Sequence, residues 1–245
     1  MSGMKYRRPA FLFLPLLLAA CGSAPEHAAP ILPAAPSVTR AEVRQIADAY
    51  TQMQWNGRRS LARHGNDPDG LRVDTPDKGV RRKMGYRFWW TCGSNQGMPY
   101  KWGGFDTPQQ FLQRLHTDAT VYAGDYASPG KIQGGDDAVS RYAAGIDCSG
   151  FVSRCWRLER PYSTRELGAL CRPLGSVAEL EPGDIMLLPG VHVWLFMGWK
   201  DAARSHMLIA EAGGVPVWNC AYKYVDTQHF LDEGYRPYRY RNIKD

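Results

Sequence analysis

Gly145-Ile146-Asp147-Cys148-Ser149-Gly150-Phe151-Val152-Ser153-Arg154-Cys155-Trp156 is the stretch that decides the fold of this chain. It begins with residues that favour a turn. It then runs into a pattern in which Phe151, Val152, Cys155 and Trp156 share one apolar face at helical spacing. The sequence therefore predicts a helix that begins at or close to Cys148.

A cysteine at the start of a helix lies where unpaired backbone N–H groups and the positive end of the helix dipole favour a thiolate. A free thiol titrates near roughly pH 8.5, and a helix N-terminus beside a histidine lowers that value. We therefore interpret Cys148 as a catalytic nucleophile.

A thiolate nucleophile needs a base and a polar group that orients the base. His192 opens an apolar strand directly after a turn, which places its ring at the end of a sheet. Glu211 lies inside the next apolar strand, where a carboxylate is costly unless it is paired. The alternatives are a histidine satisfied in the core and a glutamate paired with an arginine.

A second informative stretch is Met98-Pro99-Tyr100-Lys101-Trp102-Gly103-Gly104. The paired glycines admit a close backbone approach, and Tyr100 and Trp102 point to one side if the segment is extended. Aromatic packing under a turn is the alternative for this segment taken alone.

The order of the predicted elements indicates an α+β fold, with N-terminal helices packed on a C-terminal antiparallel sheet of about five strands. A capping box at Thr39 predicts a helix to about Trp55, and another at Thr107 predicts a helix to about His116. Further helices are expected over 138–144, 148–156 and 163–170, and a long loop over 117–137. Strand patterns cover 183–189, 192–198, 207–212, 215–225 and 235–243.

Taken together, Pro99 to Gly104, Asp147-Cys148-Ser149-Gly150-Phe151, Pro182-Gly183-Asp184 and His192-Val193 resemble, in that order, the NlpC/P60 papain-like cysteine peptidases. The resemblance covers roughly residues 86–225. It implies a papain-like domain that cleaves peptide bonds in bacterial cell-wall peptides, typically between D-γ-glutamate and a diamino acid. It also implies that Cys148 is the nucleophile, His192 the base, Tyr100 a neighbour of the thiolate, and Asp147 a candidate for binding a substrate amino group.

The chain departs from that family in three places. The third polar residue is Glu211 where the family usually has histidine, and His206 in the preceding loop is the alternative. Trp194 stands where the family commonly has a small residue. It shares a strand face with His192 and is expected, like Trp102, to line the substrate cleft. Some forty residues separate Gly104 from Asp147, and this insert, 105–146, is expected to form a wall or lid of the groove.

The N-terminus predicts export. Lys5, Arg7 and Arg8 precede an apolar run over 10–20, too short to span a bilayer. Residues 1–20 resemble a lipoprotein signal peptide with Cys21 as the lipidated residue, and a plain secretory signal is the alternative. Residues 21–38 read as an Ala/Pro-rich tether, followed by one catalytic domain, 39–245, whose N-terminal extension is 39–97. We expect an envelope protein held by lipid, in the outer membrane facing the periplasm if the host is Gram-negative.

The charge balance argues against a nucleic-acid partner. The whole chain carries 30 basic and 24 acidic residues, a net charge of +6, and removal of three basic residues with the leader leaves +3. The expected partners are peptidoglycan peptides and a membrane, and the protein is expected to be a monomer. A thiol amidase or acyltransferase on a non-wall substrate and a non-catalytic envelope lipoprotein are the alternatives.

An oxidising compartment permits disulfides among Cys92, Cys155, Cys171 and Cys220. A Cys155–Cys171 pair is attractive because the two residues are close in sequence, and buried free thiols are the alternative. The histidines and cysteines show no zinc spacing, so we expect neither a metal nor another cofactor.

Overall fold

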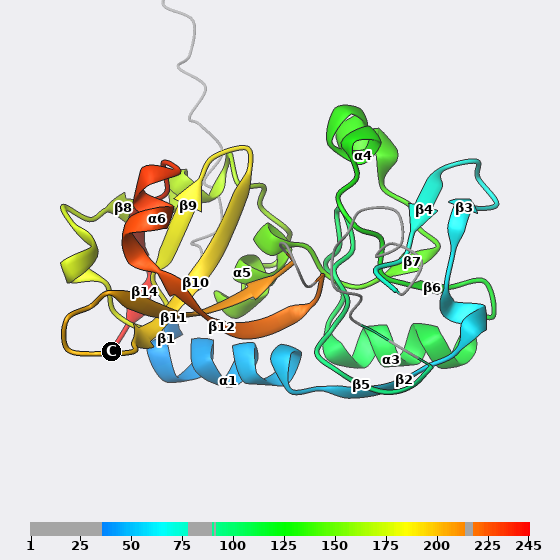
Figure 1. Cartoon of the computed structure of the whole chain (residues 1–245), viewed down its shortest axis with the longest axis horizontal. Coiled ribbons are helices and arrows are strands. Elements are labelled where there is room, and N and C mark those ends of the chain that lie inside the picture. The colour runs from blue at the N-terminus through cyan, green and yellow to red at the C-terminus, as the bar shows by residue number, and fades with distance from the viewer. Residues whose placement is uncertain (1–35, 78–89, 91, 214–217) are drawn as a thin grey trace, which may run out of the picture. The chain divides into compact units, whose positions relative to one another are not determined.

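The computed structural model describes residues 36–77, 90, 92–213 and 218–245. Its largest sheet has six antiparallel strands in the order β12-β11-β10-β9-β13-β8 (Figure 1). These strands are β8 Cys171–Pro173, β9 Ile185–Leu188, β10 His192–Trp199, β11 His206–Ala212, β12 Cys220–Asp226 and β13 Arg236–Tyr240. With the helices around it, this sheet confirms the predicted α+β class.

Five α-helices lie within the described residues: α1 Arg40–Thr51, α3 Pro108–Thr117, α4 Pro129–Gly134, α5 Cys148–Cys155 and α6 Thr227–Asp232. The predicted capping boxes of α1 and α3 are both formed, by Thr39 with Glu42 and by Thr107 with Gln110. In each box the threonine side chain accepts a backbone N–H of the first helical turn. The side chain of the third helical residue in turn accepts the backbone N–H of the threonine.

Short paired strands accompany the main sheet. They are β1 Val38–Thr39 with β14 Ile243–Lys244, β2 Gln54–Gly57 with β5 Gly93–Gln96, β3 His64–Asn66 with β4 Arg72–Asp74, and β6 Tyr122–Ala123 with β7 Ala143–Ala144. The described residues also contain four single turns of 3₁₀-helix: η1 Arg59–Leu61, η2 Gly135–Ala138, η3 Leu167–Leu170 and η4 Val177–Glu179.

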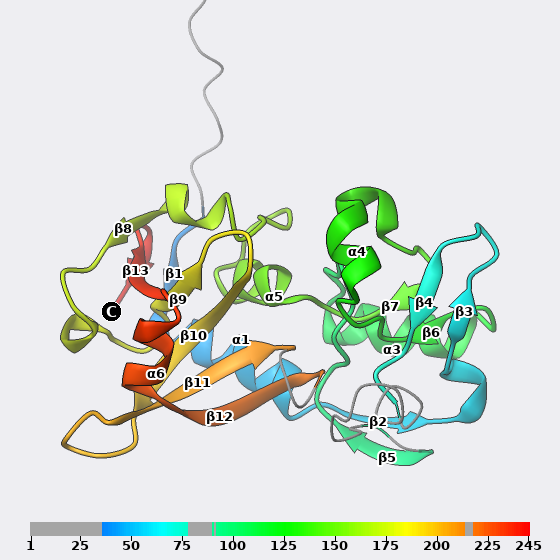
Figure 2. The same cartoon turned by 45° about the horizontal axis from the view of Figure 1, so that its top comes forward.

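The central strands of the main sheet, β9, β10 and β11, are buried on both faces. Helices α1 and α5 cover one face, where Val193, Leu195 and Ala210 join the larger core cluster. Helix α6 lies against the other face, where Trp194 and Phe196 pack in a second cluster (Figures 1 and 2). Because both of their faces are covered, these three strands are mainly runs of apolar residues rather than alternating ones, which is why the sequence reveals them.

Five of the six strands fall where the sequence predicts them, and the short edge strand β8 was not predicted. The helix expected over 138–144 is wrong: only its first residue is helical, in η2, and Ala143–Ala144 form β7. Its alanines favour a helix in isolation, but pairing of β7 with β6 overrides that weak preference. The helix expected over 163–170 is a turn followed by η3, and the loop expected over 117–137 contains β6 and α4.

Three predictions at the N-terminal side fall partly or wholly outside the described residues: the signal peptide 1–20, the lipidated Cys21, and the tether before Pro36. The last tether residues belong to the fold, since Tyr240 donates its hydroxyl proton to the Pro36 carbonyl at 2.8 Å and Val38 is buried. In the part of the chain that is described, no helix has the length and apolar character needed to cross a membrane.

Candidate active site

Cys148 is the first residue of α5, as the sequence predicts, and its side chain is buried. Asp147 caps this helix: one carboxylate oxygen accepts the Gly150 N–H at 2.6 Å and the Ser149 hydroxyl at 3.1 Å. Cys148 is therefore held at the positive end of a helix whose first N–H groups have no partner within the helix.

His192 opens β10 and Glu211 lies in the neighbouring strand β11. The Nε2 atom of His192 contacts a Glu211 carboxylate oxygen at 2.6 Å, and the Cys148 side chain lies close enough to His192 to raise its pKa. Since Nε2 is taken by the carboxylate, Nδ1 is the ring nitrogen that remains for the thiol. The structure thus brings together the three residues assigned to catalysis from the sequence.

Burial and the neighbouring side chains act in opposite directions on the pKa values of His192 and Glu211. Burial by itself lowers the pKa of His192, but the charge and hydrogen bond of Cys148 and those of Glu211 outweigh it and raise the pKa to about 10. Burial likewise acts to raise the pKa of Glu211, yet its contacts with His192 and Lys223 hold it below the usual value. The arrangement favours a protonated, positively charged imidazole.

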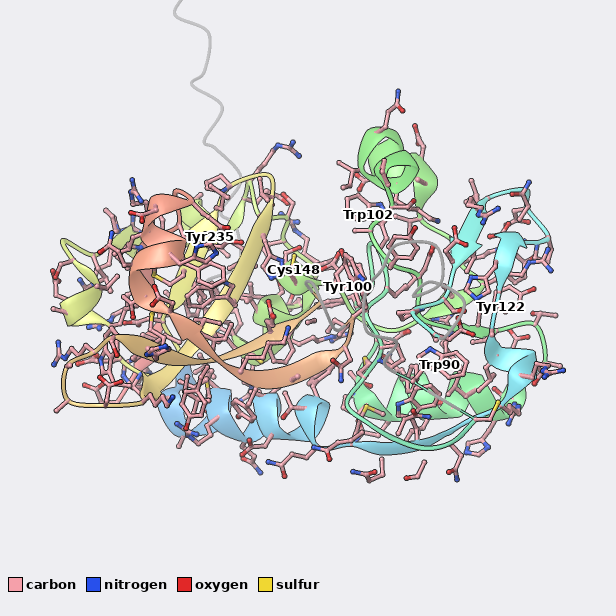
Figure 3. All side chains as sticks on the ribbon, viewed as in Figure 1. Trp90, Tyr100, Trp102, Tyr122, Cys148 and Tyr235 are labelled. Atoms are coloured by element: carbon pink, nitrogen blue, oxygen red, sulfur yellow. The ribbon has the colours of Figure 1, made fainter. Side chains whose placement is uncertain are left out.

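The Tyr100 segment reaches the nucleophile because its glycines permit backbone contact. A Cβ at Gly104 would lie 2.6 Å from the Gly145 carbonyl oxygen, and one at Gly150 would lie 2.3 Å from the Gly104 carbonyl oxygen. Only glycine allows this approach, so the two sequence stretches pack directly on each other, and Figure 3 shows Tyr100 beside Cys148. Burial, and after it the charge of Cys148, raises the pKa of Tyr100 well above its usual value.

Two aromatic residues expected at the substrate cleft have other surroundings. Trp194 is fully buried and packs against Phe230 and Tyr235 in the second core cluster. Trp102 is half-buried and donates its indole N–H to the Gly135 carbonyl in the insert at 2.9 Å. Trp194 therefore supports the sheet below the site, while Trp102 ties the Tyr100 segment to the insert.

His206, the alternative third residue, lies at the other end of β11 from Glu211. Glu211 is five positions after His206 along the strand, a distance of about 17 Å. Its Nδ1 contacts the Ser205 hydroxyl at 3.0 Å and faces Asp201. Of the two candidates, Glu211 is the one that contacts His192.

Asp147, the candidate for binding a substrate amino group, already receives bonds from the protein itself. Besides Gly150 and Ser149, the Gly103 backbone lies close enough to act on the pKa of its carboxyl group. Burial raises the pKa of this carboxyl group, although these donors act in the opposite direction. Its established contacts are those of a helix cap.

Sequence reasoning missed three neighbours of the site. Lys223 in β12 forms an ion pair with Glu211. The Trp218 carbonyl accepts the Tyr100 N–H at 2.9 Å. Burial is the main cause that raises the pKa of Tyr235, and the charges of Glu211 and Cys148 add to it. In the sequence, Lys223 is marked only as a charged residue within a predicted strand. The register of β12 against β11, which places it beside Glu211, is set by the tertiary structure.

The remaining cysteines of the described chain, Cys92, Cys155, Cys171 and Cys220, are free thiols, so the Cys155–Cys171 bridge is not formed. Burial raises the pKa of Cys155, and raises that of Cys171 to about 12. Among the described residues no three His, Cys, Asp or Glu side chains converge as metal ligands would.

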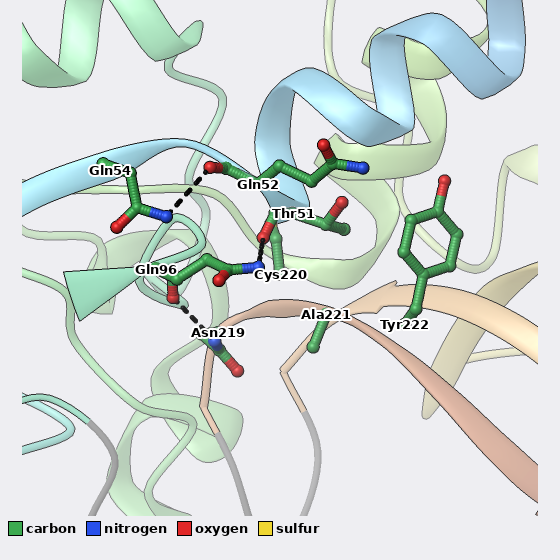
Figure 4. A pocket seen from close by; sticks show the side chains of 8 residues that line it. All are labelled: Thr51, Gln52, Gln54, Gln96, Asn219, Cys220, Ala221 and Tyr222. Atoms are coloured by element: carbon green, nitrogen blue, oxygen red, sulfur yellow. Dashed lines mark hydrogen bonds between the residues drawn. The ribbon is translucent and has the colours of Figure 1, made fainter.

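A pocket of about 590 Å³ opens elsewhere, between the end of α1 and strands β2, β5 and β12 (Figure 4). Side-chain amides of Gln52, Gln54, Gln96 and Asn219 line it. Its lining residues include no histidine or acidic side chain beside the Cys220 thiol.

Comparison of the chain with known protein families, with curated proteins and with solved structures finds no match.

Proposed function

We propose that this protein is a cysteine peptidase of the NlpC/P60 type, with a papain-like fold, that hydrolyses peptide bonds in peptidoglycan stem peptides. The observation that carries the proposal is the chain of contacts from Cys148 at a helix N-terminus through His192 to Glu211. The order of the Tyr100, Cys148 and His192 motifs, which resembles that family, supports the substrate class.

In the proposed reaction the Cys148 thiolate attacks the carbonyl carbon of the scissile amide. Backbone N–H groups at the start of α5 face the developing oxyanion. The C–N bond then breaks as the amine leaves with the proton of His192, and the acyl group remains on sulfur. Water gives a proton to His192 and its oxygen to the acyl carbon, which releases the acid and restores the thiolate–imidazolium pair.

Glu211 fixes the ring of His192 in the orientation that presents Nδ1 to the thiol, and it stabilises the charged imidazole. The expected bond is the one between D-γ-glutamate and the diamino acid, as the resemblance implies. A lipid on Cys21 would hold the domain in the envelope, where this substrate lies.

The test is digestion of purified stem peptides by the wild type and by Cys148→Ala, with mass spectrometry of the products. We expect cleavage by the wild type and a loss of at least about a thousandfold in the variant. Cys92→Ala, which removes an exposed thiol, should cleave like the wild type. Identical products from wild type and Cys148→Ala would overturn the proposal.

A further inference from the structure

The second oxygen of the Glu211 carboxylate has its own partner. One oxygen contacts His192 and the other accepts the ammonium group of Lys223. In the register of β11 and β12, Lys223 stands opposite Ile209, two residues from Glu211 and on the same face of the sheet. Glu211 is 6% exposed, so both of its charged contacts are made largely out of water.

A carboxylate in this position poses a problem that a neutral side chain would not. A thiolate, an imidazolium and a carboxylate together leave one negative charge in excess in a buried site, which is costly. The ammonium of Lys223 makes the sum zero. It also occupies the carboxylate oxygen that His192 does not use, which prevents the group from rotating away from the ring.

We infer that Lys223 is a positioning residue of this site, which acts through Glu211 to hold His192 in place and to balance the charge of the carboxylate. The inference rests on the proposed role of Cys148, His192 and Glu211. A structural ion pair would have a different signature, because its loss would lower stability without changing the ionisation of the thiol–imidazole pair.

The first measurement uses no substrate: the rate at which iodoacetamide alkylates Cys148, followed by peptide mass mapping across a range of pH. Lys223→Met leaves the carboxylate charge unopposed, so the rate profile should move to higher pH by about half a unit or more. Glu211→Gln leaves the ammonium unopposed, so its profile should move to lower pH. The double variant has the wild-type net charge and should return close to the wild-type profile.

The second measurement is kcat for stem-peptide cleavage in the same set. Lys223→Met should lower kcat by about tenfold in the presence of Glu211, the loss of one charged hydrogen bond, and should cost nothing further in the Glu211→Gln background. Lys223→Arg should keep most of the activity. Lys200→Met, at an exposed lysine directly after β10, is the matched control and should behave like the wild type.

The role of Lys223 is overturned if the profiles of the wild type, Lys223→Met and Glu211→Gln coincide, or if Lys223→Met costs the same kcat in both backgrounds. If the alkylation profiles of the variants shift as expected but the wild type cleaves no stem peptide, the proposed substrate is wrong and the role of Lys223 stands. The two failures are therefore distinguishable.

Discussion

At the scale of single residues, the defining feature is an imidazole placed between the Cys148 side chain and the Glu211 carboxylate. His192 is the first residue of β10, and burial of its ring by itself favours the neutral form. The pKa nevertheless rises to about 10, because Cys148 and Glu211 both contact the ring. This balance makes the folded state retain a proton that the unfolded chain releases.

The free energy of unfolding should therefore depend on pH in a specific way. Because the pKa of His192 is 6.5 in an unfolded chain and about 10 in the fold, its stabilising contribution is complete below about pH 6.5 and is lost as the pH rises toward 10. Denaturant unfolding between pH 6 and about 10 should show this loss, at most about 1.4 kcal/mol per pH unit, in the wild type and not in His192→Gln. Parallel curves for the two proteins would contradict the assignment.

At the scale of elements, α5 and the Tyr100 segment create the site jointly. The Asp147 cap begins α5 one residue before the nucleophile, and Gly104 and Gly150 allow the two backbones to touch. The cap and the glycines are local sequence features, but their consequence is a fixed position for the sulfur atom.

Substitution of Asp147 should show whether the cap both stabilises α5 and positions the nucleophile. Asp147→Ala loses the bond to Gly150 and should lower the free energy of unfolding by about 1–2 kcal/mol, and it should also slow alkylation of Cys148. Asp147→Asn retains an acceptor and should lose less. Asp226→Ala removes the equivalent cap of α6, which accepts the His229 N–H at 2.8 Å, and should affect stability alone. Unchanged alkylation in Asp147→Ala would show that the cap does not position the nucleophile.

At the scale of the domain, the insert 105–146 is bound to the N-terminal extension rather than free. The contacts between them are buried: the Asp125 carboxylate accepts the backbone N–H of Asp74, and the Ser140 hydroxyl donates to Asp67. Within the insert, Asp125 also forms an ion pair with Lys131 of α4 at 2.6 Å, and both side chains are almost fully buried. The insert is therefore a structural layer of the domain, beside the Tyr100 segment that it contacts through Trp102.

Breaking this buried ion pair should be costly. Burial raises the pKa of Asp125 to about 6, and Lys131→Met would leave that carboxylate without its cation. We expect a loss of about 3–5 kcal/mol in the free energy of unfolding, and recovery of most of it when Asp125→Asn is added. Arg141→Met, which breaks the exposed pair with Asp69, should have no measurable effect. A loss for Lys131→Met no larger than that of Arg141→Met would show that this ion pair does not stabilise the insert.

The sequence by itself determined the features that depend on neighbouring residues: the caps of α1 and α3, the start of α5 at Cys148, five of the strands, and the candidacy of Cys148, His192 and Glu211. Each of these is set by periodicity or by a contact within four residues. Tertiary structure decided what depends on register and burial: Ala143–Ala144 as a strand, Trp194 in the core, Glu211 rather than His206 beside His192, and Lys223 on the carboxylate. Those outcomes depend on which strands pair and in which register. Packing between segments that are distant in sequence decides this pairing, and local preference does not.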